Sequence, residues 1–319
     1  MIPKKIKVAV VGDVHDQWSK KDEEALLYLG IDLVLFVGDF GNESVEIVRE
    51  VAGLNLPKAV ILGNHDAWFS ATKWGRKKAP YDHGVEDRVQ QQLDLLGTSH
   101  VGYGKLDFPH LGISVVGSRP FSWGGSKWGC QDFYFNRYGI ASFDDSKNLI
   151  VKQFQQTTES NIIFVGHNGP FGLGANPEDT CGKDWNPIGG DFGDPDFQGG
   201  LEECQRAILS NRMDISAQSL DYTPWCDRSI SLVAFGHMHH KLRHTKERLR
   251  TIINRDNQNI IYLNSACTPR VQNFFGQSSR NFSVVTYVEG KIEDISLIWV
   301  TDKPEILSII PLLKTQKCS

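Results

Sequence analysis

Short apolar runs that end in glycine and a polar residue constrain the fold of this chain more than any other feature. In the first hundred residues, three such runs at 6–11, 33–37 and 59–62 alternate with helix-like stretches at 20–29 and 43–51. Strands alternating with helices of about ten residues are typical of βαβ units on a buried parallel sheet. We therefore expect an α/β fold with a ligand site at the carboxyl ends of these strands.

Further strand-like runs follow in the middle and at the end of the chain. Residues 113–116 and 161–165 are rich in Val and Ile and are separated by an aromatic, Gly-containing stretch. From residue 231 onward the chain is predominantly β-like, with runs at 232–235, 260–263, 282–287 and 295–300. Successive strands joined by short turns predict an antiparallel or mixed second sheet in this part.

The length of 319 residues is compatible with one large domain or two smaller ones. Polar motifs spread from Asp13 to His239 must meet at one site, which favours a single domain over residues 1–319. Two stretches interrupt the strand pattern, at 118–160 and 168–228, and we expect them to be insertions that cap the site or act as a lid.

Composition limits the classes of partner. The chain has 34 Lys and Arg against 38 Asp and Glu, a formal charge of -4, so we expect no extended nucleic-acid binding. No apolar run approaches the roughly 18 residues of a membrane span, so no membrane partner is expected. The six cysteines are scattered without metal-binding spacing, and a chain of this size needs no disulfides, which favours a cytoplasmic location.

Five polar motifs directly after predicted strands hold the residues suited to chemistry. They are Gly12-Asp13-Val14-His15, Gly38-Asp39, Gly63-Asn64-His65-Asp66, Gly166-His167 and Gly236-His237-Met238-His239. Residues at i and i+2 of an extended chain lie on the same side, so the outer residues of the first and last motifs can each hold a common ion. Mixed His and carboxylate donors favour Mn, Fe or Zn over Mg or Ca. Asp39, alone in its motif, suits a bridge between two ions.

The ordered set DxH, GD, GNHD, H and GHxH resembles the calcineurin-like metallophosphoesterase superfamily, and the general sequence style resembles an uncharacterised cyanobacterial and plant branch of it. The resemblance implies a four-layer sandwich of two mixed β-sheets flanked by helices. It also implies two divalent or trivalent transition-metal ions, manganese first with iron or zinc as alternatives. The ligands of one ion would be Asp13, His15, Asp39 and His239, and those of the other Asp39, Asn64, His167 and His237.

The same resemblance implies a reaction. A hydroxide held between the two ions would attack a phosphomonoester or phosphodiester in line, His65 would face the scissile phosphate, and Asp66 would orient the His65 imidazole. The second motif reads Gly-Asp-Phe-Gly-Asn-Glu and lacks the arginine of protein phosphatases, so a small-molecule or nucleotide-type substrate is favoured. Protein phosphatase activity, and a non-catalytic scaffold or regulator that retains the fold, remain the alternatives.

Candidates for substrate binding lie outside the motifs. Arg119 is a candidate for a phosphate, with Trp123 and Trp128 as stacking surfaces, although packing within an insertion explains these side chains equally well. Asn168 and His240 each follow a candidate metal ligand directly, so we expect them beside the site.

Overall fold

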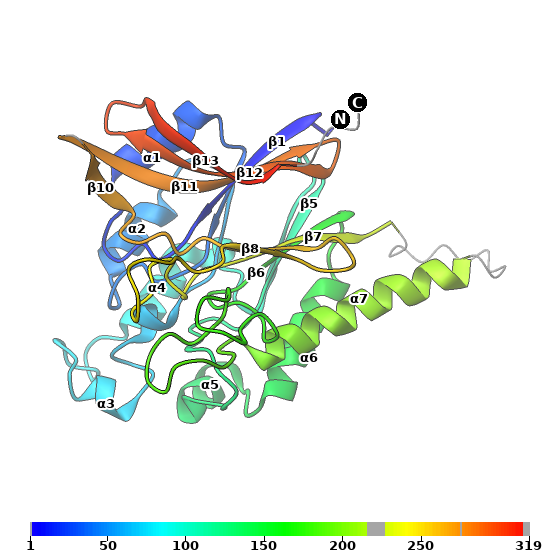
Figure 1. The fold of residues 1–319 in the computed structure, drawn as a ribbon. Helices are drawn as coiled ribbons and strands as arrows, with labels where there is room; N and C mark the ends of the chain where they lie inside the picture. The colour runs from blue at the N-terminus through cyan, green and yellow to red at the C-terminus, as the bar shows by residue number, and fades with distance from the viewer. Residues whose placement is uncertain (1, 216–226, 275, 315–319) are drawn as a thin grey trace.

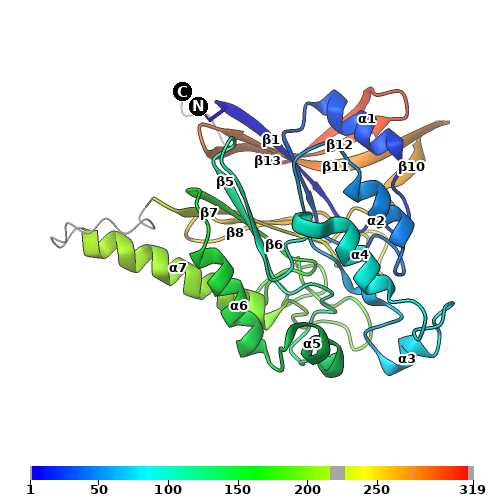
Figure 2. The ribbon, with the colours of Figure 1, turned by 180° about the vertical axis from the view of Figure 1, so that it is seen from behind.

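Two β-sheets packed face to face form the centre of the molecule, and helices cover their outer faces (Figure 1). The computed structural model describes residues 2–215, 227–274 and 276–314. The order of layers is helix, sheet, sheet, helix, and both sheets are mixed (Figures 1 and 2). The expected four-layer α/β sandwich is therefore confirmed.

The first sheet has the order β13-β12-β11-β1-β2-β3, with β10 beside β11. Its strands are β1 (Lys5–Val11), β2 (Leu33–Phe36), β3 (Lys58–Val60), β10 (Val271–Phe274), β11 (Gln277–Val288), β12 (Lys291–Thr301) and β13 (Ile306–Lys314). β1, β2 and β3 are parallel, as the βαβ pattern predicts. β11 runs antiparallel to β1, with Val8 opposite Val285.

The second sheet has the order β4-β5-β6-β7-β9-β8. Its strands are β4 (Lys105–Phe108), β5 (Ile113–Gly117), β6 (Asn161–Val165), β7 (Ser229–Phe235), β8 (Ile253–Arg255) and β9 (Ile261–Asn264). The prediction of a mixed second sheet in the C-terminal part is confirmed for β7 and β9 and is wrong for β11 and β12. β7 and β9 extend the parallel run begun by β5 and β6, whereas β11 to β13 complete the first sheet at the open edge of β1.

The helices lie in two outer layers and begin and end at recognisable signals. They are α1 (Lys20–Leu29), α2 (Val45–Ala52), α3 (Lys73–Arg76), α4 (Arg88–Leu96), α5 (Gln131–Tyr138), α6 (Phe143–Gln155) and α7 (Pro195–Ile215). α1 starts at a capping box between Ser19 and Asp22, which satisfies backbone donors at its first turn. It stops at Gly30, whose φ of 65° favours glycine.

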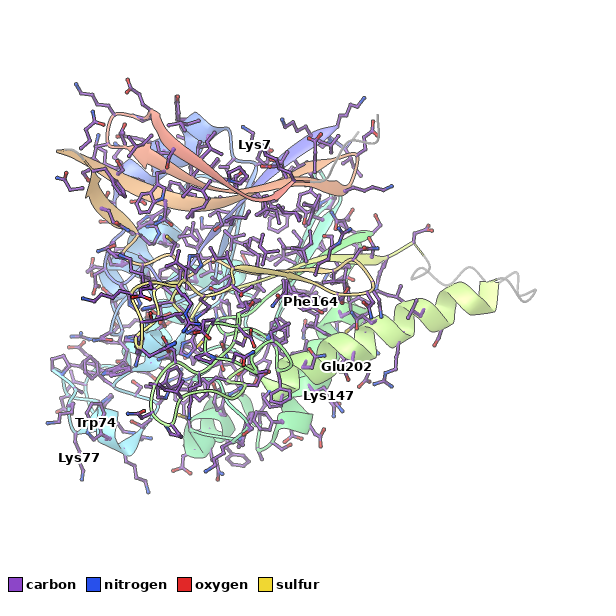
Figure 3. The ribbon with its side chains drawn as sticks, in the orientation of Figure 1. Lys7, Trp74, Lys77, Lys147, Phe164 and Glu202 are labelled. Atoms are coloured by element: carbon purple, nitrogen blue, oxygen red, sulfur yellow. The ribbon has the colours of Figure 1, made fainter. Side chains whose placement is uncertain are left out.

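Three apolar layers fill the space between these elements. Val8 and Val10 of β1 lie between the sheets, whereas the alternate residues Ala9 and Val11 face α1 and α2. On the far side, Phe164 of β6 packs in the layer that the second sheet shares with α6 and α7 (Figure 3). Because β1 is buried on both faces, its sequence is a nearly continuous apolar run.

The two expected insertions do not behave as caps along their whole length. α6 and α7 pack against each other on the outer face of the second sheet, where they form a structural layer (Figure 2). Only short loops within 118–160 and 168–228 reach the site described below, and residues 216–226 of the second lie outside the described part of the chain. Within the described residues, no helix combines the length and apolarity needed to cross a bilayer.

Candidate metal centre

The five polar motifs meet where the carboxyl ends of the two sheets come together. Asp13 follows β1, Asp39 follows β2 and Asn64 begins the short 3₁₀ turn after β3, all in the first sheet. His167 follows β6 and His237 follows β7, both in the second sheet. Since the two sheets face each other, donors from both sides can surround a common space, as expected for open α/β sheets.

Backbone strain concentrates at these strand ends. The non-glycine residues that adopt positive φ there include Asp13 (48°), His15 (44°), Asp16 (61°), Asp39 (58°) and His237 (66°). Gly38, with φ of 95°, lies so close to its surroundings that a Cβ would be 2.5 Å from the Gly63 nitrogen and 2.7 Å from Nδ1 of His167. The glycine in this motif is therefore required by the close approach of neighbouring loops.

One group of donors contains Asp13, His15 and His239, with ligand atoms all within 4.8 Å of one another. Nε2 of His15 lies 3.3 Å from Nε2 of His239. A second group shares His15 with the first and consists of His15, Asp39 and His65. His15 and Asp39 therefore connect the first group to the rest of the centre.

A third group consists of Asp39, His167 and His237. Nε2 of His167 lies 3.2 Å from Nδ1 of His237, 2.9 Å from Oδ1 of Asn64 and 3.2 Å from Oδ1 of Asp39. The other ring nitrogen of His167 lies 2.7 Å from the carbonyl oxygen of Val37, which can only accept, so Nδ1 carries the proton. The Nε2 lone pair of His167 is thereby directed into the centre, as in many metal-ligating histidines.

The electrostatics of these donors suit cations. Burial lowers the pKa of His237 well below its usual value and lowers that of His239 to about 4, so both imidazoles are neutral. Burial, and then the neighbouring Asp39, raise the pKa of Asp13 well above its usual value. Buried carboxylates surrounded by neutral imidazoles form a site that metal ions stabilise, and the nitrogen and oxygen donors fit transition metals. The residues present fit a pair of such ions that share Asp39.

His65 is held by two neighbours that the sequence did not reveal. Its Nδ1 lies 2.6 Å from Oδ1 of Asn42, and its ring stacks on Trp68 with centroids 4.5 Å apart. Trp68 in turn stacks on Trp123 at 5.1 Å. Since Asn42 occupies Nδ1, the Nε2 atom of His65 is the one directed toward Asp39, at 4.0 Å from Oδ2. No sequence signal marks Asn42, because only the folded loop brings it to the imidazole.

The expected contact between Asp66 and the His65 imidazole is absent, and this role for Asp66 is corrected. The buried Asp66 carboxylate accepts hydrogen bonds from three backbone amides instead, those of Asp39 at 3.0 Å, Phe40 at 2.9 Å and Gly63 at 2.7 Å. Asp66 therefore fixes the second and third motif loops to each other and acts on the centre through their backbone.

A pocket of about 450 Å³ opens over the donors. Asp39, Asn64, His65, His237 and His239 lie among its lining residues. The other side chains that line it are mainly aromatic or charged: Trp68, Trp123, Trp185, Phe192, Lys241, Arg243, Arg250 and the acidic Asp184. The pocket therefore combines the metal donors with surfaces suited to a planar, negatively charged molecule.

Arg119 does not reach this pocket, and its expected contact with substrate is corrected. Its side chain is 4% exposed and pairs with Asp194 at 2.8 Å and Asp196 at 2.9 Å. Trp128 lies over the same guanidinium and packs on Tyr134. A buried guanidinium needs carboxylate partners. Here they are Asp194 and Asp196, which lie 75 and 77 residues further along the chain, so the sequence alone does not reveal the pairing.

Asn168 and His240 are also structural, and neither lines the pocket. Asn168 is fully buried and donates from Nδ2 to the carbonyl of Phe192 at 2.8 Å, which positions an aromatic residue of the wall. His240 is buried, with Nε2 3.0 Å from the carbonyl of Asn264. Each therefore supports the site without lining it.

Arg250 is a further residue that the sequence did not single out. Its guanidinium donates to the carbonyl of His239 at 3.0 Å and to those of Pro177 and Asp179 at 3.0 and 2.9 Å. It also pairs with Asp184 at 3.4 Å. The loop that was expected to be a lid is thus bound to the backbone of a metal-donor residue.

The sequence profile of the calcineurin-like phosphoesterase family matches residues 6–241, which spans all five motifs. The chain belongs to the calcineurin-like phosphoesterase family. Proteins of this family depend on two metal ions, in agreement with the overlapping donor groups around Asp39. No curated protein matches the chain significantly in sequence.

Several solved structures resemble this one at low sequence identity. A dimetal phosphatase from Danio rerio is 10% identical with a TM-score of 0.42, over 97% of this chain and 99% of that one. A novel archaeal phosphodiesterase is 10% identical with a TM-score of 0.34, over 96% and 100%. A Plasmodium protein described as the anchor in the inner membrane complex is 12% identical with a TM-score of 0.43, over 99% and 91%. These identities are too low to transfer a function.

Proposed function

We propose that the chain hydrolyses a phosphomonoester or phosphodiester of a small molecule or nucleotide, using two metal ions. The observation that carries the proposal is the pair of donor groups on either side of Asp39, at the floor of a pocket. Asp39 would bridge the ions. Asp13, His15 and His239 would complete one site, and Asn64, His167 and His237 the other.

The donor types favour manganese, with iron or zinc as alternatives, because imidazole and carboxylate are mixed. Metal ions bound there would supply a water activated near neutral pH and would polarise the phosphoryl oxygens. His167 holds its proton on Nδ1 against Val37, so its Nε2 is available as a ligand without any proton rearrangement.

His65 would transfer a proton to the leaving oxygen. It is close enough to His15 and Asp39 to share a donor group with them, but the ligand sets proposed above do not include it, and Asn42 at its Nδ1 leaves Nε2 to face the pocket. A positioned proton donor contributes typically 10²–10⁴-fold to the rate. Trp68 stacks on one face of the imidazole and Trp123 stacks on Trp68, which limits the rotation of the His65 ring.

The pocket also bears on the alternatives. The second motif loop presents Asn42 to His65 and has no arginine with which to clamp a phosphorylated side chain, which disfavours a protein phosphatase. A scaffold would not need a complete donor set. A single catalytic domain and a cytoplasmic location belong to the same proposal, and the four described cysteines that are free thiols are compatible with the latter.

Turnover of p-nitrophenyl phosphate and of bis(p-nitrophenyl) phosphate by the manganese-loaded protein tests the proposal and separates monoesterase from diesterase. Asp39→Asn should abolish turnover, and His65→Ala should reduce it about 10²–10⁴-fold. His110→Ala, which changes an exposed histidine outside the pocket, is the matched control. Full activity in both site variants, or no turnover by a metal-loaded protein, would contradict the proposal.

A further inference from the structure

The segment that follows β7 carries both metal donors and cations into the same pocket. Within this segment, His237, Met238, His239, Lys241 and Arg243 line the pocket, whereas the side chains of His240 and Leu242 are buried. The segment therefore places two cations in the same pocket as two of the metal donors.

Lys241 and Arg243 line the pocket and are both exposed side chains. No carboxylate among the described residues forms an ion pair with either side chain. Asp184, the acidic side chain beside them, is occupied by the Arg250 guanidinium and by the backbone N–H of Arg243 at 2.7 Å. Two pocket-lining cations that have no carboxylate partner among the described residues are suited to an anionic group of a ligand.

The position of Arg243 is fixed by an aromatic neighbour. Its guanidinium carbon lies 5.3 Å from the ring centre of Trp185, and Trp185 packs edge-on against Phe192 at 4.7 Å. Asn168 holds the backbone of Phe192 from behind. The cation thus belongs to a supported aromatic wall and is not a freely rotating surface side chain.

The chain limits how far the cations can lie from the metal donors. The Cα atoms of Lys241 and Arg243 are two and four residues beyond His239, so they are at most about 7 and 14 Å from its Cα. The aromatic side chains of the same pocket offer a surface for a planar ring.

We propose that the substrate is a nucleotide that carries a second phosphate group besides the scissile one, and that Lys241 and Arg243 bind this second phosphate. The inference rests on the proposed phosphoesterase function and names the substrate class of that site. The aromatic wall binds the base, and the two cations select for the additional negative charge.

Two chromogenic esters that differ by one phosphate test the inference. Thymidine 5′-(p-nitrophenyl phosphate) and its 3′-phosphorylated form share the base, the sugar and the leaving group. The manganese-loaded protein should prefer the 3′-phosphorylated ester by about tenfold or more in kcat/KM, as expected for charge-assisted contacts. Lys241→Ala and Arg243→Ala should each reduce this ratio, whereas Lys246→Ala, at an exposed cation outside the pocket, should leave it at the wild-type value.

A binding measurement on the metal-free protein gives a second readout. Quenching of tryptophan fluorescence should show tighter binding of thymidine 3′,5′-bisphosphate than of thymidine 5′-phosphate, and Arg243→Ala should reduce the difference. Hydrolysis of both esters at equal efficiency would overturn the inference and leave the phosphoesterase proposal intact. Failure to hydrolyse either ester, with no turnover of the simple aryl phosphates, would overturn the phosphoesterase proposal itself.

Discussion

The contact between Asn42 and His65 makes a quantitative prediction about catalysis. Oδ1 of Asn42 lies 2.6 Å from Nδ1 of His65, and a hydrogen bond to a charged imidazole is worth about 1.5–3 kcal/mol. If His65 donates a proton in the transition state, Asn42→Ala should lower kcat and kcat/KM together by about 10- to 100-fold. Asn42 is exposed, so the variant should unfold at nearly the wild-type temperature.

A double-mutant cycle separates this positioning role from a general loss of structure. With p-nitrophenyl phosphate as substrate and manganese present, Asn42→Ala should lower the rate strongly in the wild type and hardly at all in a His65→Ala background. Asn55→Ala, at another exposed asparagine, should behave as the wild type. Equal losses in both backgrounds would show that Asn42 does not act through His65, and the reasoning from the contact would be refuted.

Three further outcomes follow from the structure. Arg119→Met should lower the free energy of unfolding, measured with urea, by about 3–5 kcal/mol, because Asp194 and Asp196 lose their buried partner. Wild-type stability together with a raised KM would instead indicate that Arg119 contacts the substrate. Removal of metal with a chelator should lower the thermal midpoint, and manganese at about 100 times its Kd should restore about 2.7 kcal/mol; an unchanged midpoint in calorimetry would argue against bound metal. Burial lowers the pKa of His100 from its usual 6.5 to about 4, so the stability contributed by the neutral imidazole is complete above pH 6.5 and is lost as the pH falls toward 4. In His100→Leu, the free energy of unfolding should not show this loss on acid titration. Identical titrations of the two proteins would contradict the prediction.

The parts of this structure that the sequence predicts are those determined locally. Val8 and Val10 alternate with Ala9 and Val11 in an apolar run, and such a run between glycine-ended loops indicates a buried strand in almost any context. The motif residues could be identified as candidate donors for the same reason. Each motif directly follows a strand, and parallel strands have their carboxyl ends at the same edge of a sheet, so these residues are expected to lie close together.

The parts that the sequence does not predict depend on contacts between distant segments. Asn42 faces His65 only because two loops cross at the end of the first sheet. From the sequence, Arg119 is a candidate to bind a phosphate, but in the fold its guanidinium is paired with Asp194 and Asp196. Likewise, nothing local indicates that β11 pairs with β1 and does not begin a sheet of its own.

Lys241 lies two residues after a metal-donor histidine, and no feature of the sequence marks it as part of the site. The fold places it in the same pocket as that histidine.

The metal content of the purified chain after reconstitution with manganese tests the central claim most directly. Inductively coupled plasma mass spectrometry should find two ions per chain in the wild type, and Asp39→Asn should lose at least one of them because the bridging carboxylate is gone. A single ion in the wild type, or two ions retained in Asp39→Asn, would contradict a centre in which Asp39 joins two donor groups.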